Sequence, residues 1–114
     1  MAPLQGEVWL VDLDPVRGHE QAGRRPALVL SVDKFNQGPA GLAIVVPITG
    51  TDRQQPLHVA IEPPEGGMRK RSFAKPEDIR SVASARLVTR WGRVAPDTLR
   101  SVVERVRLLI WVPG

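Results

Sequence analysis

Residues 14–26, with the sequence DPVRGHEQAGRRP, decide how this chain is organised. This stretch is rich in charged residues, Gly and Pro, and it separates two apolar runs at residues 6–12 and 27–32. The two runs have the length and the Val and Leu content of buried strands. Hairpin loops usually have about two to five residues, so a longer charged loop is more often functional than a simple connection. The sequence therefore predicts two strands joined by a functional loop.

The rest of the chain continues in short apolar segments and ends in a different pattern. Further strands are predicted at residues 42–48, 57–62, 72–75, 78–82 and 87–94, with polar breaks at 33–41, 49–56 and 63–71. Pro47 predicts an edge position or a bulge near the end of its strand. Apolar residues at helical spacing predict a terminal helix over 97–110 that buries Leu99, Val102, Val103, Val106, Leu109 and Ile110. We expect one domain over residues 1–114, mainly β, built as a small antiparallel β-barrel covered by this helix.

Composition restricts the function classes. The chain has 114 residues and a net charge of +4, from 16 basic and 12 acidic residues, and most of the basic residues are Arg. Arg suits bidentate contact with phosphate, so this balance favours a nucleic-acid partner. The absence of Cys excludes disulfides, thiolate metal sites and a Cys nucleophile. No apolar run is long enough to cross a bilayer and no signal peptide is visible, so we expect a cytoplasmic protein without a membrane contact.

The order of the predicted strands suggests where a site lies. In an antiparallel meander, alternate loops share one end, so the 14–26 loop meets the 49–56 loop, while 33–41 and 63–71 lie at the opposite end. The residues expected to converge are Arg24, Arg25, Thr49, Thr51 and Arg53, with His19 and Glu20 nearby. From spacing alone, a structural salt bridge for Arg25 and a turn cap for Thr49 are the favoured roles.

Other groups offer alternatives that the residues alone leave open. His19 and His58 both titrate near neutrality and could serve as a base and an acid, although His58 lies within a predicted strand. Residues 69–71, Arg-Lys-Arg, are by default a solvated charge run and secondarily a phosphate contact. Trp9 is expected in the core, and Phe35 is the preferred surface aromatic for stacking on a base.

Four short motifs resemble the MazF/PemK family of toxin endoribonucleases. Residues 20–21 read Glu-Gln, 23–26 read Gly-Arg-Arg-Pro, 46–49 read Val-Pro-Ile-Thr and 79–81 read Ile-Arg-Ser. The resemblance implies an SH3-like barrel of the CcdB/PemK type, with Arg25 and Thr49 as the catalytic pair. It also implies RNA contacts from Arg17, His19, Glu20, Gln21, Arg24, Ser72, Asp78 and Arg80. His19, Arg71 and Asp78 depart from the usual Ser, Asp and Gln of the family, and we expect these positions to tune base preference.

The resemblance further implies a reaction and its partners. Single-stranded RNA or mRNA would be cut at short motifs without a metal or other cofactor, by attack of the RNA 2′-OH on the adjacent phosphate. The products would be a 2′,3′-cyclic phosphate and a 5′-OH. A homodimer and a cognate MazE-like antitoxin are implied as well. Two alternatives are a non-catalytic CcdB-like toxin that acts by protein contact through residues 107–111, and a nucleic-acid-binding barrel without catalysis.

Overall fold

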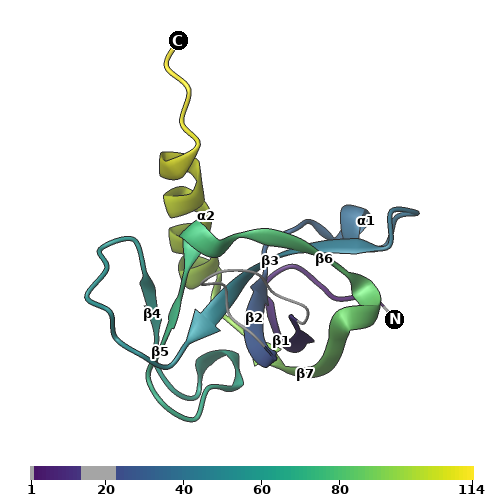
Figure 1. The fold of residues 1–114 in the computed structure, drawn as a ribbon, viewed down its shortest axis with the longest axis horizontal. Helices are drawn as coiled ribbons and strands as arrows, with labels where there is room; N and C mark the ends of the chain where they lie inside the picture. Colours follow the sequence, from purple (N-terminus) through teal and green to yellow (C-terminus); the bar gives the residue numbers. More distant parts are fainter. Residues whose placement is uncertain (1, 14–22) are drawn as a thin grey trace.

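The computed structural model describes residues 2–13 and 23–114 (Figure 1). The strands and helices follow the order predicted from the sequence, with short 3-10 turns between the later strands. Their bounds are β1 Glu7–Asp12, β2 Arg24–Val29, α1 Asp33–Asn36, β3 Leu42–Thr49, β4 Val59–Ile61, η1 Glu65–Gly67, β5 Ser72–Ala74, η2 Pro76–Asp78, β6 Arg80–Ala83, η3 Ser84–Arg86, β7 Leu87–Arg93 and α2 Pro96–Leu109.

The strands form one curled, antiparallel sheet that closes into a half-barrel, with α2 beside it (Figure 1). The strand order is β4-β5-β3-β2-β1-β7, and β6 also pairs with β3. The predicted mainly-β fold with a C-terminal helix is therefore confirmed. The short helix α1 was not predicted, because its four residues are too few to show a helical period.

Pro47 lies in the middle of the sheet, so its predicted edge position is wrong. β3 pairs with β2 on one side, where Ala27 is opposite Pro47. On its other side β3 pairs with β6 as far as Val45 and with β5 from Ile48. Pro47 lies between these two ladders, where the missing backbone N–H interrupts neither of them.

The predicted meander is also wrong at β4. β5 inserts between β4 and β3, so β4 runs in the same direction as β3 and does not pair with it. The segment at residues 50–58 is consequently a crossover and not a hairpin turn. The start of β5 lies beside the end of β3, because Phe73 is opposite Thr49. Residues 63–71, which lead into β5, therefore approach the Thr49 end of the sheet and not the opposite end.

The core is divided between the two faces of the sheet, as alternation along the strands requires. One cluster, which includes Val8, Leu28 and Val46, lies on the face covered by α2. The other includes Val11, Ala27 and Val45 on the opposite face, and a partly buried Trp9 packs against it. The expected core role of Trp9 is thus confirmed in part.

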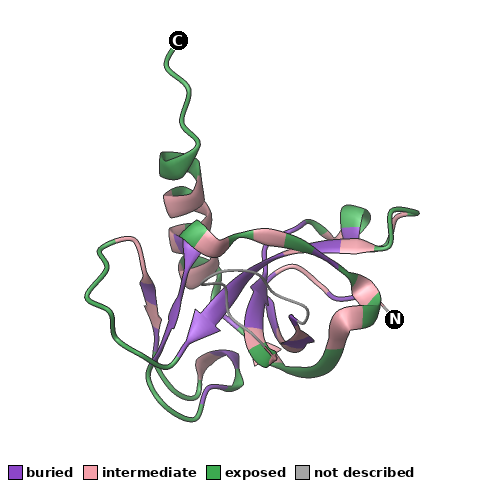
Figure 2. Cartoon of the chain, in the orientation of Figure 1, coloured by how far each residue is buried: buried purple, intermediate pink, exposed green. Residues whose placement is uncertain are grey.

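Helix α2 covers the sheet with only its first turns. Val102 is fully buried, and Leu99, Val103 and Val106 pack against the core. Burial of the last two predicted residues is wrong: Leu109 and Ile110 are 45% and 70% exposed. The helix extends past the sheet, so the sheet does not cover its final turn (Figures 1 and 2).

A close backbone contact docks η1 onto β7. A methyl group on Gly92 would lie 2.7 Å from the backbone nitrogen of Gly67, a distance that side chains do not tolerate. Gly67 also has a φ of +76°, which favours glycine. These two residues let the turn lie directly on the strand. The contact fixes the position of the basic segment that follows Gly67.

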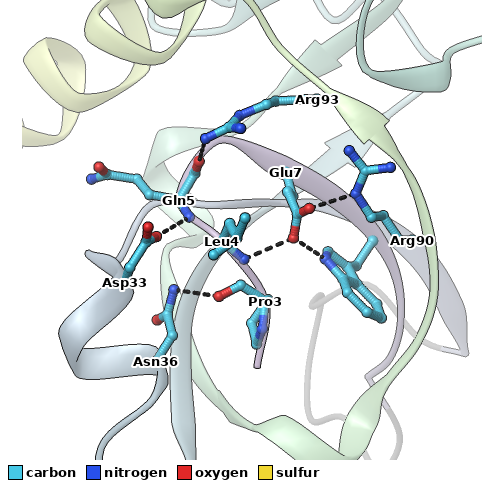
Figure 3. Close-up of polar contacts among 9 residues, drawn as sticks. Pro3, Leu4, Gln5, Glu7, Asp33, Asn36, Arg90 and Arg93 are labelled. Carbon is cyan, nitrogen blue, oxygen red and sulfur yellow. Dashed lines mark hydrogen bonds and ion pairs between the residues drawn. The ribbon is translucent and has the colours of Figure 1, made fainter. Parts of the chain in front are cut away.

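A buried carboxylate ties the N-terminal segment to β7 (Figure 3). Glu7 is 5% exposed and accepts hydrogen bonds from the backbone N–H of Leu4 at 2.7 Å and from Trp9 Nε1 at 3.0 Å. Its other oxygen accepts from Nε of Arg90, which makes an ion pair. Burial alone raises the pKa of Glu7, but these donors outweigh burial and leave the pKa below the ordinary 4.5.

We predict that Glu7→Gln lowers the free energy of unfolding by about 1.5–3 kcal/mol at neutral pH, because the charged hydrogen bonds are lost. The folded pKa is lower than the unfolded one, so the carboxylate stabilises the fold above about pH 4.5. This contribution is lost as the pH falls through the folded pKa. Denaturant unfolding of both proteins across pH should therefore show curves that converge in acid. A constant difference at all pH values would contradict the ionic role.

Candidate functional site

A groove of about 690 Å³ opens where β2, β3 and β7 meet the docked turn η1. β2 contributes Arg25 and Pro26, the end of β3 contributes Ile48 and Gly50, and β7 contributes Arg90 and Trp91. The remaining lining comes from the segment between η1 and β5, namely Gly67, Met68, Arg69, Lys70 and Ser72. Among the described residues, this lining includes four cationic side chains and no carboxylate, so the groove suits a polyanion.

Arg25 and Thr49 come to the same end of the sheet. Ala27 is paired with Pro47, and extending this antiparallel register by two residues brings Arg25 level with Thr49 on the same face. Arg25 is exposed at the start of β2, whereas Thr49 is 7% exposed. The convergence expected from strand order is found for these two residues. Arg53 is exposed on the crossover and does not line the groove.

The hydroxyl of Thr49 has a local role as an acceptor. Thr49 Oγ1 accepts the backbone N–H of Thr51 at 3.2 Å, which is the turn-capping role favoured from spacing alone. This bond uses an oxygen lone pair and leaves the hydroxyl proton to be donated elsewhere. Capping therefore holds the oxygen in place without removing its ability to act as a donor.

A second recess, of about 380 Å³, holds Asp78 and Arg80. Pro47 lines this recess, and Ile48, the next residue along β3, lines the groove. The two hollows therefore flank the end of β3. Asp78 also pairs with Lys75 at 2.7 Å.

The remaining predicted RNA contacts divide into three groups. Ser72 lines the groove, is 5% exposed and donates its hydroxyl to the backbone oxygen of Lys70 at 3.0 Å. Arg24 is exposed next to Arg25 on β2 but does not line the groove. Four residues of the 14–22 segment, Arg17, His19, Glu20 and Gln21, lie outside the described residues.

His58 does not take part in this site. Its side chain is 3% exposed, and Nε2 is 2.6 Å from a carboxylate oxygen of Glu77. His58 lines neither the groove nor the second recess, because packing holds its ring against η2. The alternative that pairs His58 with His19 stays a prediction, since His19 lies outside the described residues.

Sequence reasoning missed Gly67, Met68 and Trp91 as lining residues, and it gave residues 69–71 a phosphate contact only as a second choice. The basic run was assigned to the far end because β4 was expected to pair with β3. Phe35, the preferred stacking residue, lies on α1 and does not line the groove. Trp91 lines the groove. It lies at a bulge of β7 that strand periodicity does not reveal.

Comparison with known proteins identifies the family. Residues 4–110 match the model of the PemK-like, MazF-like toxins of type II toxin–antitoxin systems. The chain belongs to this family. It is 37% identical to endoribonuclease MazF9 of Mycobacterium tuberculosis (strain ATCC 25618 / H37Rv), over 91% of this chain and 92% of that protein. It is 35% identical to the endoribonuclease toxin MazF of Escherichia coli (strain K12), over 95% and 94% of the two chains.

Solved structures of MazF share the fold. MazF from Deinococcus radiodurans superposes with a TM-score of 0.87 at 28% identity, covering 98% of this chain and 99% of that one. A MazE–MazF complex from the same organism gives a TM-score of 0.82 at 28% identity, over 99% of each chain. The family resemblance noted from the motifs is thus confirmed over nearly the whole chain.

The described part of the chain shows neither a transmembrane helix nor a cluster of metal ligands. No helix within residues 2–13 and 23–114 has the length and apolar content that a transmembrane span requires. In the same part of the chain, His, Asp and Glu do not gather in groups of three that could hold a metal ion.

Proposed function

We propose that this protein is a toxin endoribonuclease that cleaves single-stranded RNA by attack of a 2′-OH on the neighbouring phosphate. One observation carries the proposal: Arg25 lines a cationic groove, and Thr49 lies level with Arg25 on the neighbouring strand. Membership of the MazF/PemK family supports it, and the two relatives described above are named endoribonucleases.

The chemistry follows from the residue types. The nucleophile is part of the substrate, so the protein has to align the 2′-OH with the phosphate and stabilise the charge that develops. The Arg25 guanidinium offers fixed donors to the phosphate oxygens, and the Thr49 hydroxyl offers one more. The O–P bond to the leaving 5′ oxygen breaks as the 2′ O–P bond forms. A 2′,3′-cyclic phosphate and a 5′-OH result.

The substrate contacts extend beyond this pair. We assign contacts with nucleotides on either side of the scissile bond to Ser72, which lines the groove, and to Asp78 and Arg80, which line the second recess. Arg24, Arg17, His19, Glu20 and Gln21 complete the proposed RNA surface. Unpaired bases expose the edges that such side chains read, which is why single-stranded RNA is the proposed substrate.

We also propose a cognate antitoxin and a homodimer as partners. An antitoxin with an acidic segment would neutralise the cationic groove, and a MazE–MazF complex is among the similar structures. Beyond the sheet, Leu108, Ile110, Trp111 and Val112 are each at least 62% exposed, which offers apolar surface to a second copy. Neither partner is needed to form the groove described above.

We expect the purified protein to cut a long, unstructured RNA into discrete fragments in the presence of EDTA and to leave DNA of the same sequence intact. The fragments should end in cyclic phosphate and begin with 5′-OH, which end-specific enzymatic labelling detects. Intact RNA across varied sequences, from folded protein free of antitoxin, would instead favour a non-catalytic toxin or a binding module.

Substitutions in the pair should separate chemistry from binding. Arg25→Ala should lower kcat by about a thousandfold or more, the scale of a lost transition-state arginine. Thr49→Val should lower kcat by about a hundredfold, while Thr49→Ser keeps the hydroxyl and most of the activity. Arg100→Ala removes an exposed arginine from α2 and is the matched control. Single-turnover cleavage assays measure the rate of each of these four variants. An Arg25→Ala protein with the activity of the control would overturn the assignment.

A further inference from the structure

Trp91 is displaced into the groove by a β-bulge. Val8 pairs with Gly92 and Trp9 pairs with Arg90, so Trp91 is the extra residue that has no partner in β1. A bulge redirects the side chain of the extra residue, and here Arg90 and Trp91 both line the groove. The indole is 41% exposed. The groove thus contains an accessible aromatic side chain.

The side chain of Lys70 also lines the groove, next to the residue that follows Thr49. A methyl group on Gly50 would lie 2.6 Å from Lys70 Nζ, so the ammonium group rests against Gly50, the residue after Thr49. The docking of Gly67 on Gly92 determines this placement, because only two residues separate Gly67 from Lys70. Trp91 and Lys70 are thereby held in one groove by the same turn.

The cations around the groove differ in whether a carboxylate neutralises them. Arg71 pairs with Glu62 at 2.8 Å and also covers the ring of Phe73. Arg90 pairs with the buried Glu7. By contrast, neither Arg69 nor Lys70 has an acidic partner within the described part of the chain. Two uncompensated cations beside an exposed indole are the elements of a nucleotide site.

We propose that Trp91 and Lys70, with Arg69, form a subsite for one unpaired nucleotide adjacent to the scissile bond. The indole stacks on the base, and the Lys70 ammonium contacts the phosphate that links this nucleotide to the one at Arg25 and Thr49. Stacking accepts any base, so this subsite supplies affinity and register, while base choice belongs to other residues. The inference rests on the proposed function, because it assumes that RNA occupies the groove.

The test measures binding separately from cleavage. The probe is a short, unstructured, fluorescein-labelled RNA in which fluorine replaces every 2′-OH, so no 2′-OH attack occurs. Trp91→Leu should weaken binding by about 5- to 150-fold, the range for one lost base stack. Trp91→Phe keeps an aromatic face and should bind nearly as wild type. Tryptophan emission should be quenched by the RNA in wild type, and this quenching should be absent in Trp91→Phe.

Lys70 is tested through salt dependence. Lys70→Met should flatten the slope of log Kd against log salt by about 0.7, the contribution of one phosphate contact on a single strand. Lys34→Met removes the same charge from α1, away from the groove, and should leave the slope unchanged. Thermal denaturation of each variant checks that it is folded.

Cleavage of the matching natural RNA by wild type is measured in parallel. If wild type cleaves, but Trp91→Leu binds normally and Lys70→Met matches Lys34→Met, the subsite is wrong and the endoribonuclease proposal stands. If wild type does not cleave, but the variants lose binding as expected, the subsite stands and the cleavage proposal fails. Absence of RNA binding by folded wild type would overturn the subsite directly.

Discussion

The groove depends on one close approach of two backbones, that of Gly67 on η1 to Gly92 on β7. Side chains at these positions would keep the turn away from the strand. Because the turn is in contact, the residues that follow it cross the end of β3 and enter β5 beside Thr49. A segment that belongs to neither β2 nor β3 thus becomes one wall of the site formed at their ends.

The distribution of charge follows from a second feature, the buried carboxylate of Glu7. This group pairs with Arg90 and, through the backbone of Leu4, holds the N-terminal segment against the same strand. Arg90 therefore contributes mainly to structure. Arg69 and Lys70, which have no acidic partner among residues 2–13 and 23–114, lie on the docked segment. Cations with and without such a partner in that part of the chain thus lie on neighbouring elements.

The sequence predicted the elements well where local pattern decides them, and the motifs correctly indicated the family. The strands around the 14–26 loop and the helix after Pro96 follow from apolar periodicity. Pairing was predicted less well, because the insertion of β5 between β4 and β3 is a long-range choice that no local pattern encodes. The same error put residues 63–71 at the wrong end, and the bulge at Trp91 concealed the aromatic residue of the groove.

Some site predictions depend on three-dimensional geometry that the sequence alone does not reveal. Asp78 and Arg80 line the second recess together with Pro47 and do not line the groove, because β6 pairs with the edge of β3 that is opposite to β2. The exposed end of α2 shows a related limit. Helical spacing reports which residues share a face, but not how far the sheet beneath that face extends.

The central claim is that the RNA supplies its own nucleophile to a phosphate held beside Arg25 and Thr49. The most direct measurement compares two RNAs that are identical except for one 2′-deoxy nucleotide, on the 5′ side of a mapped cleavage site. Both should bind with similar affinity, and only the RNA that retains this 2′-OH should be cut at the site. Cleavage of the 2′-deoxy substrate at the same bond would show that another nucleophile attacks and would contradict the account.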